Sequence, residues 1–176
     1  MKSNSRTYCT MLKELLLREA TSKDTDFILG INNSVYARKY FPREKDITKK
    51  QHLVFLKNSR KRGDLYFIIQ FKGRPIGTVS IYNINSVHKR AEWGRFLLNE
   101  NVKGVGPIIE RKILDIAFKE LKLHKLYCQV IDDNSRVVDL HKLFGFKIEG
   151  VLREHLFING KFHDYIFMGK ISNDKK

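Results

Sequence analysis

The stretch NENVKGVGPIIERKILDIAF, residues 99–118, constrains the fold more than any other part of this sequence. It follows a strand-like run and leads into an amphipathic helix, with Gly104, Gly106 and Pro107 in between. Glycine allows positive φ and a close approach of the backbone to a ligand. Proline suits the first turn of a helix, where its missing N–H would have had no partner. The pattern predicts a strand, a tight loop and a helix in direct succession.

The rest of the chain alternates between strand and helix periodicities. Strand-like runs cover residues 13–20, 65–71, 75–84, 90–98, 125–131, 147–158 and 161–171. Helical patterns cover residues 21–35, 47–61, 106–121 and 134–146, the last ending at Gly145 as a C-terminal cap. We expect Thr21 or Ser22 and Thr48 to cap the first two helices. The order β-α-α-β-β-β-α-β-α-β-β predicts an α/β (α+β) fold, with a mixed sheet covered by helices on both faces.

Two finer patterns accompany these elements. In the helix of residues 47–61, Leu53, Phe55 and Leu56 form the expected core stripe. Between the last two strands, Asn159-Gly160 is a strong signal for a two-residue hairpin turn. The first pattern predicts which face of the helix packs on the sheet, and the second predicts that the chain closes with an antiparallel hairpin.

The loop before the third helix could also hold an anion. Backbone N–H groups of residues 102–106 and the positive end of the helix dipole would form a phosphate cradle, to which Lys103 adds charge. The sequence matches neither the Gly-Lys-Ser/Thr triplet of a P-loop nor the GxGxxG of dinucleotide folds. A plain surface turn is the alternative interpretation.

Length and composition indicate one soluble domain spanning residues 1–176, with residues 1–12 and 172–176 as loosely ordered tails. There is no membrane-spanning run and no signal peptide, so we expect a cytoplasmic protein that does not bind membranes. Cys9 and Cys128 are too few for a disulfide framework, and Cys128 is expected to be a buried thiol. The net charge of +15 suits a phosphate-rich partner or reflects lysines scattered over the surface. Nucleic-acid motifs are absent, so a nucleic-acid partner is not expected.

About 30 residues after the glycines, Asn134 is followed by Val137, His141 and Gly145-Phe146 at +3, +7, +11 and +12. The two motifs together resemble the GNAT superfamily of acetyl-CoA-dependent N-acetyltransferases, over residues 15–171. Family members carry Gln/Arg-x-x-Gly-x-Gly/Ala for the coenzyme A pyrophosphate and Asn-x-x-Ala-x-x-x-Tyr-x-x-x-Gly-Phe for the pantetheine arm. The resemblance implies a GNAT-like three-layer fold with a twisted, mostly antiparallel sheet of about seven strands. This chain departs from the motifs at Asn101, Pro107 and His141.

The resemblance also implies a set of site residues. The residues expected to bind acetyl-CoA are Leu97, Leu98, Asn101, Val102, Lys103, Gly104, Val105, Gly106, Asn134, Val137 and His141. Glu92 is the candidate general base, or else it orients the substrate; Gly94 beside it would permit a bulge in the strand. The alternative for Glu92 is a solvent-facing residue paired with Arg90 or Arg95. His141 is the candidate general acid, because it occupies the tyrosine position of the family motif. The alternative for His141 is an exposed histidine without a catalytic task.

Three further residues, Tyr40, Trp93 and His88, are expected to bind the acceptor. No metal is expected, because His88, His155 and His163 lack metal-ligand spacing.

Within the superfamily, the sequence resembles the branch of spermidine, ribosomal-protein and aminosugar acetyltransferases, and most of all the aminosugar enzyme of the pseudaminic-acid pathway. The leading hypothesis is therefore direct acetyl transfer, in a ternary complex, to the 4-amino group of a UDP-linked amino-dideoxy sugar. We expect few carboxylates near the pocket, and the positive charge favours a nucleotide-linked acceptor over a polycation. The alternatives are a polyamine (spermidine) or protein N-terminal acetyltransferase and, from another class, a basic RNA- or ribosome-associated binding module. A homodimer is left open.

Overall fold

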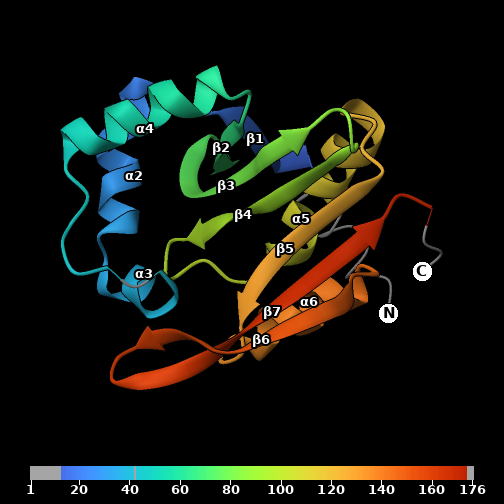
Figure 1. The fold of residues 1–176 in the computed structure, drawn as a ribbon. Helices are drawn as coiled ribbons and strands as arrows, with labels where there is room; N and C mark the ends of the chain where they lie inside the picture. The colour runs from blue at the N-terminus through green and yellow to red at the C-terminus, as the bar shows by residue number, and fades with distance from the viewer. Residues whose placement is uncertain (1–12, 42, 174–176) are drawn as a thin grey trace, which may run out of the picture.

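The computed structural model describes residues 13–41 and 43–173, and a seven-stranded sheet runs through them (Figure 1). The strands lie in the order β1-β2-β3-β4-β5-β7-β6. Their bounds are β1 Leu15–Glu19, β2 Leu65–Phe71, β3 Arg74–Asn85, β4 Arg90–Leu98, β5 Lys125–Ile131, β6 Lys147–Ile158 and β7 Lys161–Ile171. Only the β4–β5 pair is parallel. The predicted mixed, mostly antiparallel sheet is confirmed, and most of the strand bounds agree with the sequence pattern.

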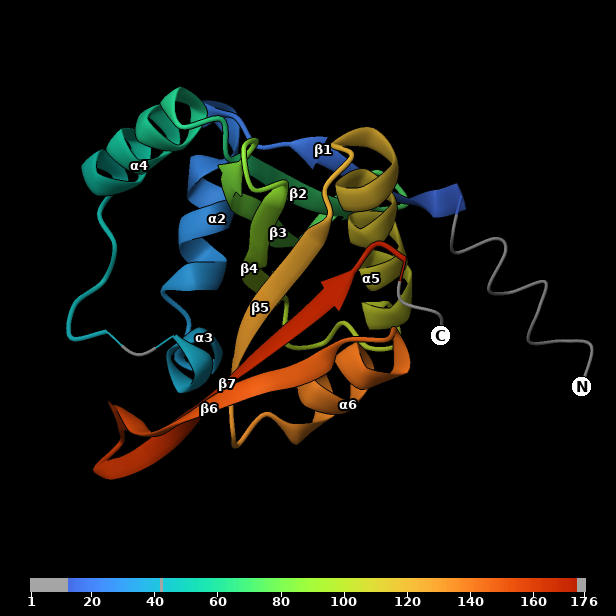
Figure 2. The ribbon, with the colours of Figure 1, turned by 45° about the vertical axis from the view of Figure 1, so that its right-hand side comes forward.

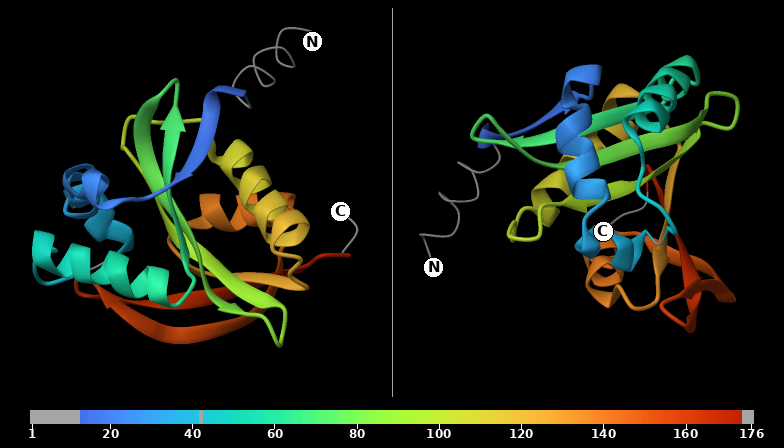
Figure 3. Two further views of the ribbon diagram at one scale, coloured as in Figure 1. Left: turned by 90° about the horizontal axis from the view of Figure 1, so that it is seen from above. Right: turned by 90° about the vertical axis from the view of Figure 1, so that its left-hand side faces the viewer.

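Helices cover both faces of the sheet, as Figure 3 shows from above. One face carries α2 (Thr25–Asn32) and α4 (Lys49–Lys61), and the other carries α5 (Gly106–Asp115) and α6 (Ser135–Leu143). Of the three buried apolar clusters among the described residues, two follow from this arrangement. The larger lies under α5 and includes Ile109 and Ile113, and the smaller joins Ile28 and Leu56 to Ile68 of β2. The sheet therefore has a hydrophobic core on each of its two faces.

The first helical segment is divided differently from the prediction. A single 3₁₀ turn (Ser22–Asp24), capped at Thr21, precedes α2, and a separate short helix α3 (Val35–Tyr40) follows it. Ser34 caps α3, because its hydroxyl accepts the Ala37 amide at 3.1 Å. Asn33 pairs in both directions with the backbone of Ile47, at 2.9 and 3.0 Å. These two hydrogen bonds fix the chain between α2 and α3 against the segment that precedes α4.

In α4 the predicted cap is confirmed and the predicted stripe is partly wrong. Thr48 and Gln51 form a capping box at the start of the helix. Leu53, however, is 40% exposed. The buried positions are His52, Leu56 and Ser59, whose spacing of four and three residues follows one helix face. Of the predicted stripe, Leu56 is buried and Phe55 packs partly buried against the same cluster, so only Leu53 lies off the buried face.

The third predicted helix ends irregularly. After Asp115 the chain forms one π-helical turn over Ile116–Glu120, in which the Leu121 amide donates to the Ile116 carbonyl at 2.9 Å. At the other end of the chain, Asn159 and Gly160 have φ of 51° and 80°, as the predicted hairpin turn requires.

The chain ends are described only in part. Of the two predicted tails, residues 1–12, which include Cys9, and residues 174–176 lie outside the described residues, while 172–173 form a turn. In the described ranges, no helix is both long and apolar enough to cross a bilayer.

Candidate active site

A cavity opens where β4 and β5 separate. These strands pair only over Arg90–Glu92 and Lys125–Tyr127, and beyond Glu92 β4 continues with β3 alone (Figure 1). The cavity, of about 940 Å³, is lined from β4, β5, α3, α6 and the loop before α5. The β5-facing edge of β4, including Leu97 and Leu98, therefore keeps backbone groups available to a ligand.

A bulge in β4 shapes one side of the cavity. Three residue steps from Gly94 to Leu97 face two from Thr78 to Ser80 on β3, so β4 carries one extra residue. The bulge predicted beside Gly94 is confirmed, but the positive φ, 50°, belongs to Arg95. Gly94 serves another purpose, because a Cβ there would lie 3.0 Å from the Tyr82 hydroxyl. A side chain at position 94 would therefore crowd the Tyr82 ring.

The loop before α5 presents unpaired amides. The N–H groups of Lys103, Gly104 and Val105 donate to no acceptor among the described residues, and α5 begins at Gly106. Gly104 has φ of 79°, a conformation that favours glycine. The predicted cradle of residues 102–106 is corrected at its first member, because the Val102 amide donates to the Asn99 carbonyl at 2.9 Å. Unpaired amides at a helix N-terminus are suited to bind the phosphates of a coenzyme.

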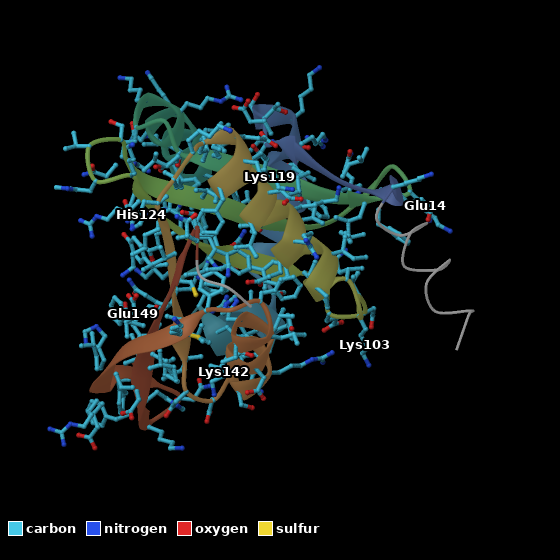
Figure 4. The ribbon with its side chains drawn as sticks, turned by 90° about the vertical axis from the view of Figure 1, so that its right-hand side faces the viewer. Glu14, Lys103, Lys119, His124, Lys142 and Glu149 are labelled. Atoms are coloured by element: carbon cyan, nitrogen blue, oxygen red, sulfur yellow. The ribbon has the colours of Figure 1, made fainter. Side chains whose placement is uncertain are left out.

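Not every residue predicted around this cradle reaches the cavity. Val102, Lys103, Gly104 and Gly106 line it, and Lys103 stands at the N-terminal end of α5 in Figure 4. Asn101 is exposed and does not line the cavity. The Val105 side chain is 3% exposed and belongs to the core under α5, so this residue offers only its amide. Asn101 therefore lies away from the cavity, whereas Val105 can still contribute to the predicted cradle through its amide.

The start of α6 forms the neighbouring part of the wall. Asn134 occupies the N-cap position, as predicted, but its side chain makes no capping hydrogen bond. Asn134 and Val137 both line the cavity. Gly106 lets the two helices approach, because a Cβ there would lie 3.2 Å from Leu140 of α6 (Figure 2). We call loop 102–107, the unpaired edge of β4 at Leu97 and Leu98, and α6 the cofactor wall.

His141 lies in the cofactor wall with a buried partner. Its Nδ1 is 3.0 and 3.1 Å from the two carboxylate oxygens of Glu110 on α5, and both side chains are buried. The imidazole also contacts the rings of Trp93 and Phe146, with centroids 5.0 and 5.1 Å away. The alternative of an exposed histidine beside Lys142 is wrong. Sequence reasoning missed Glu110, although a glutamate inside the apolar stripe of α5 was a visible signal.

Glu92 lines the same cavity from β4. It is 7% exposed and accepts hydrogen bonds from the Tyr82 hydroxyl at 2.7 Å and from Asn83 Nδ2 at 3.0 Å. Burial, together with the bond to Glu92, raises the pKa of Tyr82, so this phenol remains a donor. The alternative of a solvent-facing glutamate paired with Arg90 or Arg95 is wrong. Gly94 and Arg95 extend the cavity lining along the same strand.

The predicted acceptor residues have mixed outcomes. Tyr40 and Trp93 line the cavity, and the Trp93 side chain is almost wholly buried. His88 does not line it, because it is exposed in the β3–β4 turn, where its amide donates to Asn85 Oδ1. The cavity is also lined by Tyr82, Arg95, Asp133 and Tyr165. With Glu92 and Tyr40, they form what we call the acceptor wall.

A smaller cavity of about 200 Å³ adjoins the acceptor wall. It shares Tyr40, Ile131 and Asp133 with the main cavity and extends between α3 and the β6–β7 hairpin. Figure 2 shows these two elements next to each other, although they are far apart in the sequence. A long acceptor could therefore extend past Asp133.

Asp132, Asp133 and His163 form a cluster whose potential ligand atoms lie within 4.8 Å of one another. The sequence did not indicate this cluster, because β5–β7 pairing brings His163 beside Asp132, 31 positions earlier. His163 Nδ1 lies 3.0 Å from Asp132. Burial alone would raise the pKa of Asp132. The hydrogen bonds from His163 and from backbone amides outweigh this effect and keep the pKa below its usual value. A hydrogen-bonded pair accounts for this geometry without a metal.

Diverging parallel strands, an amide cradle at a helix start and a cavity between them define an acyl-CoA-dependent acyltransferase. The model of the acetyltransferase (GNAT) domain matches residues 14–147, and the chain belongs to this family. It is 30% identical over 170 residues to spermidine N(1)-acetyltransferase of Vibrio cholerae, covering 93% of this chain and 98% of that one. It is also 30% identical over 139 residues to acetyltransferase PseH of Campylobacter jejuni, covering 78% and 86%.

A solved structure gives the same result. The crystal structure of spermidine N-acetyltransferase from Vibrio cholerae in complex with CoA and spermine has a TM-score of 0.84 and 27% identity. The match covers 91% of this chain and 96% of that one. The protein is thus an N-acetyltransferase, and its donor is acetyl-CoA.

The residues of the cofactor wall fit this donor. The amides of Lys103, Gly104 and Val105 would bind its pyrophosphate, and the unpaired edge of β4 would bind the amides of its pantetheine arm.

Proposed function

We propose that this enzyme transfers the acetyl group of acetyl-CoA to a primary amine of a polyamine such as spermidine, directly and in a ternary complex. One observation carries the proposal: carboxylates of the acceptor wall line the cavity at Glu92 and Asp133. The sequence predicted few carboxylates near the pocket, but the fold brings Glu92 there from β4 and Asp133 from the turn after β5. The Vibrio cholerae relatives named for spermidine support the same acceptor.

The two carboxylates suit an amine with more than one cationic group. Glu92 accepts two hydrogen bonds from the protein and retains lone pairs for the reacting amine. Asp133 lies at the junction with the smaller cavity, where a second ammonium group of an extended molecule would pair with it. The net charge of +15 opposes encounter with a polycation, so specificity has to come from these local carboxylates.

Each residue has a separate role in the proposed reaction. The reacting amine must be neutral, and Glu92 takes its proton, either directly or through water. A main-chain N–H on the unpaired edge of β4 would polarise the thioester carbonyl. His141 donates a proton to the departing thiolate. Cys128 lines the cavity but takes no part, because burial raises the pKa of its thiol and leaves it a poor nucleophile.

An acceptor panel tests this proposal. Release of coenzyme A is measured with spermidine, spermine, a simple monoamine and UDP- and dTDP-linked aminosugars. We expect turnover with the polyamines and a kcat/KM at least tenfold lower for the monoamine, which lacks the second ammonium group. Turnover confined to the aminosugars would contradict the polyamine assignment.

A nucleotide-linked amino sugar is the second candidate acceptor, and Arg95 favours it. Its guanidinium lies 3.8 Å from the Tyr82 ring centroid, and its Nη1 is buried without a hydrogen-bond partner in the described part of the chain. A phosphate or sugar oxygen could satisfy such a donor. Replacing Arg95 by methionine separates the candidates: kcat/KM for an aminosugar would fall at least tenfold, whereas that for spermidine would not fall.

A further inference from the structure

The pair of Glu110 and His141 joins α5 to α6, the helix of the cofactor wall. Glu110 is 1% exposed and His141 is 2% exposed. One turn earlier, Gly106 of α5 packs against Leu140 of α6. Two successive turns of α5 thus contact α6, Gly106 beside the amide cradle and Glu110 at the imidazole.

The chemistry of the pair determines how the imidazole can act. An ionised carboxylate only accepts hydrogen bonds, so with Glu110 ionised the proton on Nδ1 points toward it, and Nε2 is the nitrogen left for a group in the cavity. Rings of Trp93 and Phe146 flank the imidazole, so its surroundings are poor in water. Isolated charges are costly at such a site, whereas an imidazolium–carboxylate pair has no net charge.

We propose that Glu110 is the positioning residue for His141, holding the imidazolium with Nε2–H directed to the departing sulfur. This inference rests on the proposed role of His141 as general acid. The amine nitrogen forms a bond to the acetyl carbon and the carbon–sulfur bond breaks. The sulfur leaves with the electron pair and takes the Nε2 proton, the amine proton passes to Glu92, and solvent restores both residues. Glu110 stabilises the cation before transfer and fixes its orientation, as carboxylates do for histidines in other enzymes.

Other groups around the pair do not replace this carboxylate. From β5, Cys128 faces it, and burial followed by the charge of Glu110 raises the pKa of that thiol. From β4, Trp93 contributes an indole, whose only polar group is a donor. Among the described contacts of His141, Glu110 is the anionic partner.

The first test replaces Glu110 by glutamine, which keeps its shape and removes its charge. We expect kcat to fall about 10- to 100-fold, while the KM of the amine and the Kd of acetyl-CoA stay within twofold. Glu120→Gln, an exposed change just beyond α5, is the matched control and should leave kcat unchanged. A wild-type kcat in E110Q would overturn the inference.

The second test uses the tyrosine that the family carries at this position. H141Y leaves Glu110 buried without a cation, so this variant should be poorly active. Tyrosine needs no carboxylate, so adding E110L should raise kcat in the H141Y background, whereas E110L alone lowers it. This reversal of sign is the expected result, and an E110L effect of the same sign in both backgrounds would overturn the inference. All four proteins are assayed below their unfolding temperatures.

A third measurement needs no acceptor. Nitrogen-15 NMR of the His141 imidazole should show both ring nitrogens protonated in the wild type, as the proposed imidazolium requires, and a changed distribution of the ring protons in E110Q. An unchanged distribution would overturn the inference even if the enzyme acetylates spermidine. If no amine is turned over while the NMR result is as expected, the proposed acceptor fails and the positioning of His141 by Glu110 stands.

Discussion

The two walls of the cavity are built from different parts of the chain. The cofactor wall uses backbone amides of one loop and the unpaired edge of β4, both within residues 97–107, together with α6. The acceptor wall uses side chains: Glu92 and Tyr82 from β4 and β3, Asp133 beyond β5, and Tyr40 from α3. Backbone recognition depends on where glycine and proline allow a particular conformation. Side-chain recognition depends on which strands the fold places next to each other.

The largest expected effect comes from acidic side chains in the cradle. Gly104→Asp combined with Gly106→Asp should raise the Kd of acetyl-CoA at least about 100-fold, or about 2.8 kcal/mol. The new carboxylates would meet the pyrophosphate, an aspartate at position 104 would be strained by the positive φ there, and a side chain at position 106 would crowd Leu140. Isothermal titration calorimetry measures this loss.

Gly73→Asp is the control for the cradle, because Gly73 also has positive φ, 74°, with open space around it, in the β2–β3 turn. It should bind acetyl-CoA like the wild type. Unchanged affinity in the double variant would remove the basis for a backbone cradle.

A substitution in the acceptor wall should impair catalysis without weakening cofactor binding. Glu92→Gln is expected to lower kcat/KM for the amine about 100-fold, because it removes the base and the charge. The Kd of acetyl-CoA should stay within twofold. Steady-state kinetics with calorimetry measure both, with Glu149→Gln on β6 as the control. An equal loss of cofactor affinity would show that the walls are not independent.

A smaller effect is expected at the far end of the acceptor wall. Asp133→Asn should raise the KM for spermidine about tenfold, because the second ammonium group loses its partner, and should leave the KM for a monoamine unchanged. Asp115→Asn on α5, where Asp115 pairs with the exposed Lys119, is the control. Equal changes for both amines would argue against a polyamine acceptor.

The smallest effect is expected at Cys128. Because its thiol has a raised pKa, it stays protonated over the assay range, so Cys128→Ala should keep kcat within about twofold and leave the pH profile unaltered. Stability should fall by about 1 kcal/mol, because a buried side chain is shortened. A lost activity, or an acetylated cysteine found by mass spectrometry, would contradict direct transfer.

The cofactor wall was largely predictable from the sequence. Gly104 and Pro107 act within a few residues of their own positions, so the cradle could be placed to within one amide, Val102 being the exception. The acceptor wall was predictable only in part. Glu92 and Tyr40 were found, but His88 was wrongly included, because nothing local shows on which side of a hairpin turn a side chain lies. Asp133 and Arg95 could not be assigned from the sequence, because they reach the cavity only through the separation of β4 from β5 and through the bulge in β4.

The sequence by itself determined the order of the strands and of the helices other than α3, the hairpin at Asn159-Gly160 and the turn at Gly104, because φ preferences and hydrophobic periodicity are local properties. Only the tertiary structure decided that Glu110 meets His141, 31 residues later, and that Asp133 joins Glu92 in one cavity. The physical reason is that such contacts depend on how two helices and two diverging strands pack, and packing is set by all the neighbouring side chains together.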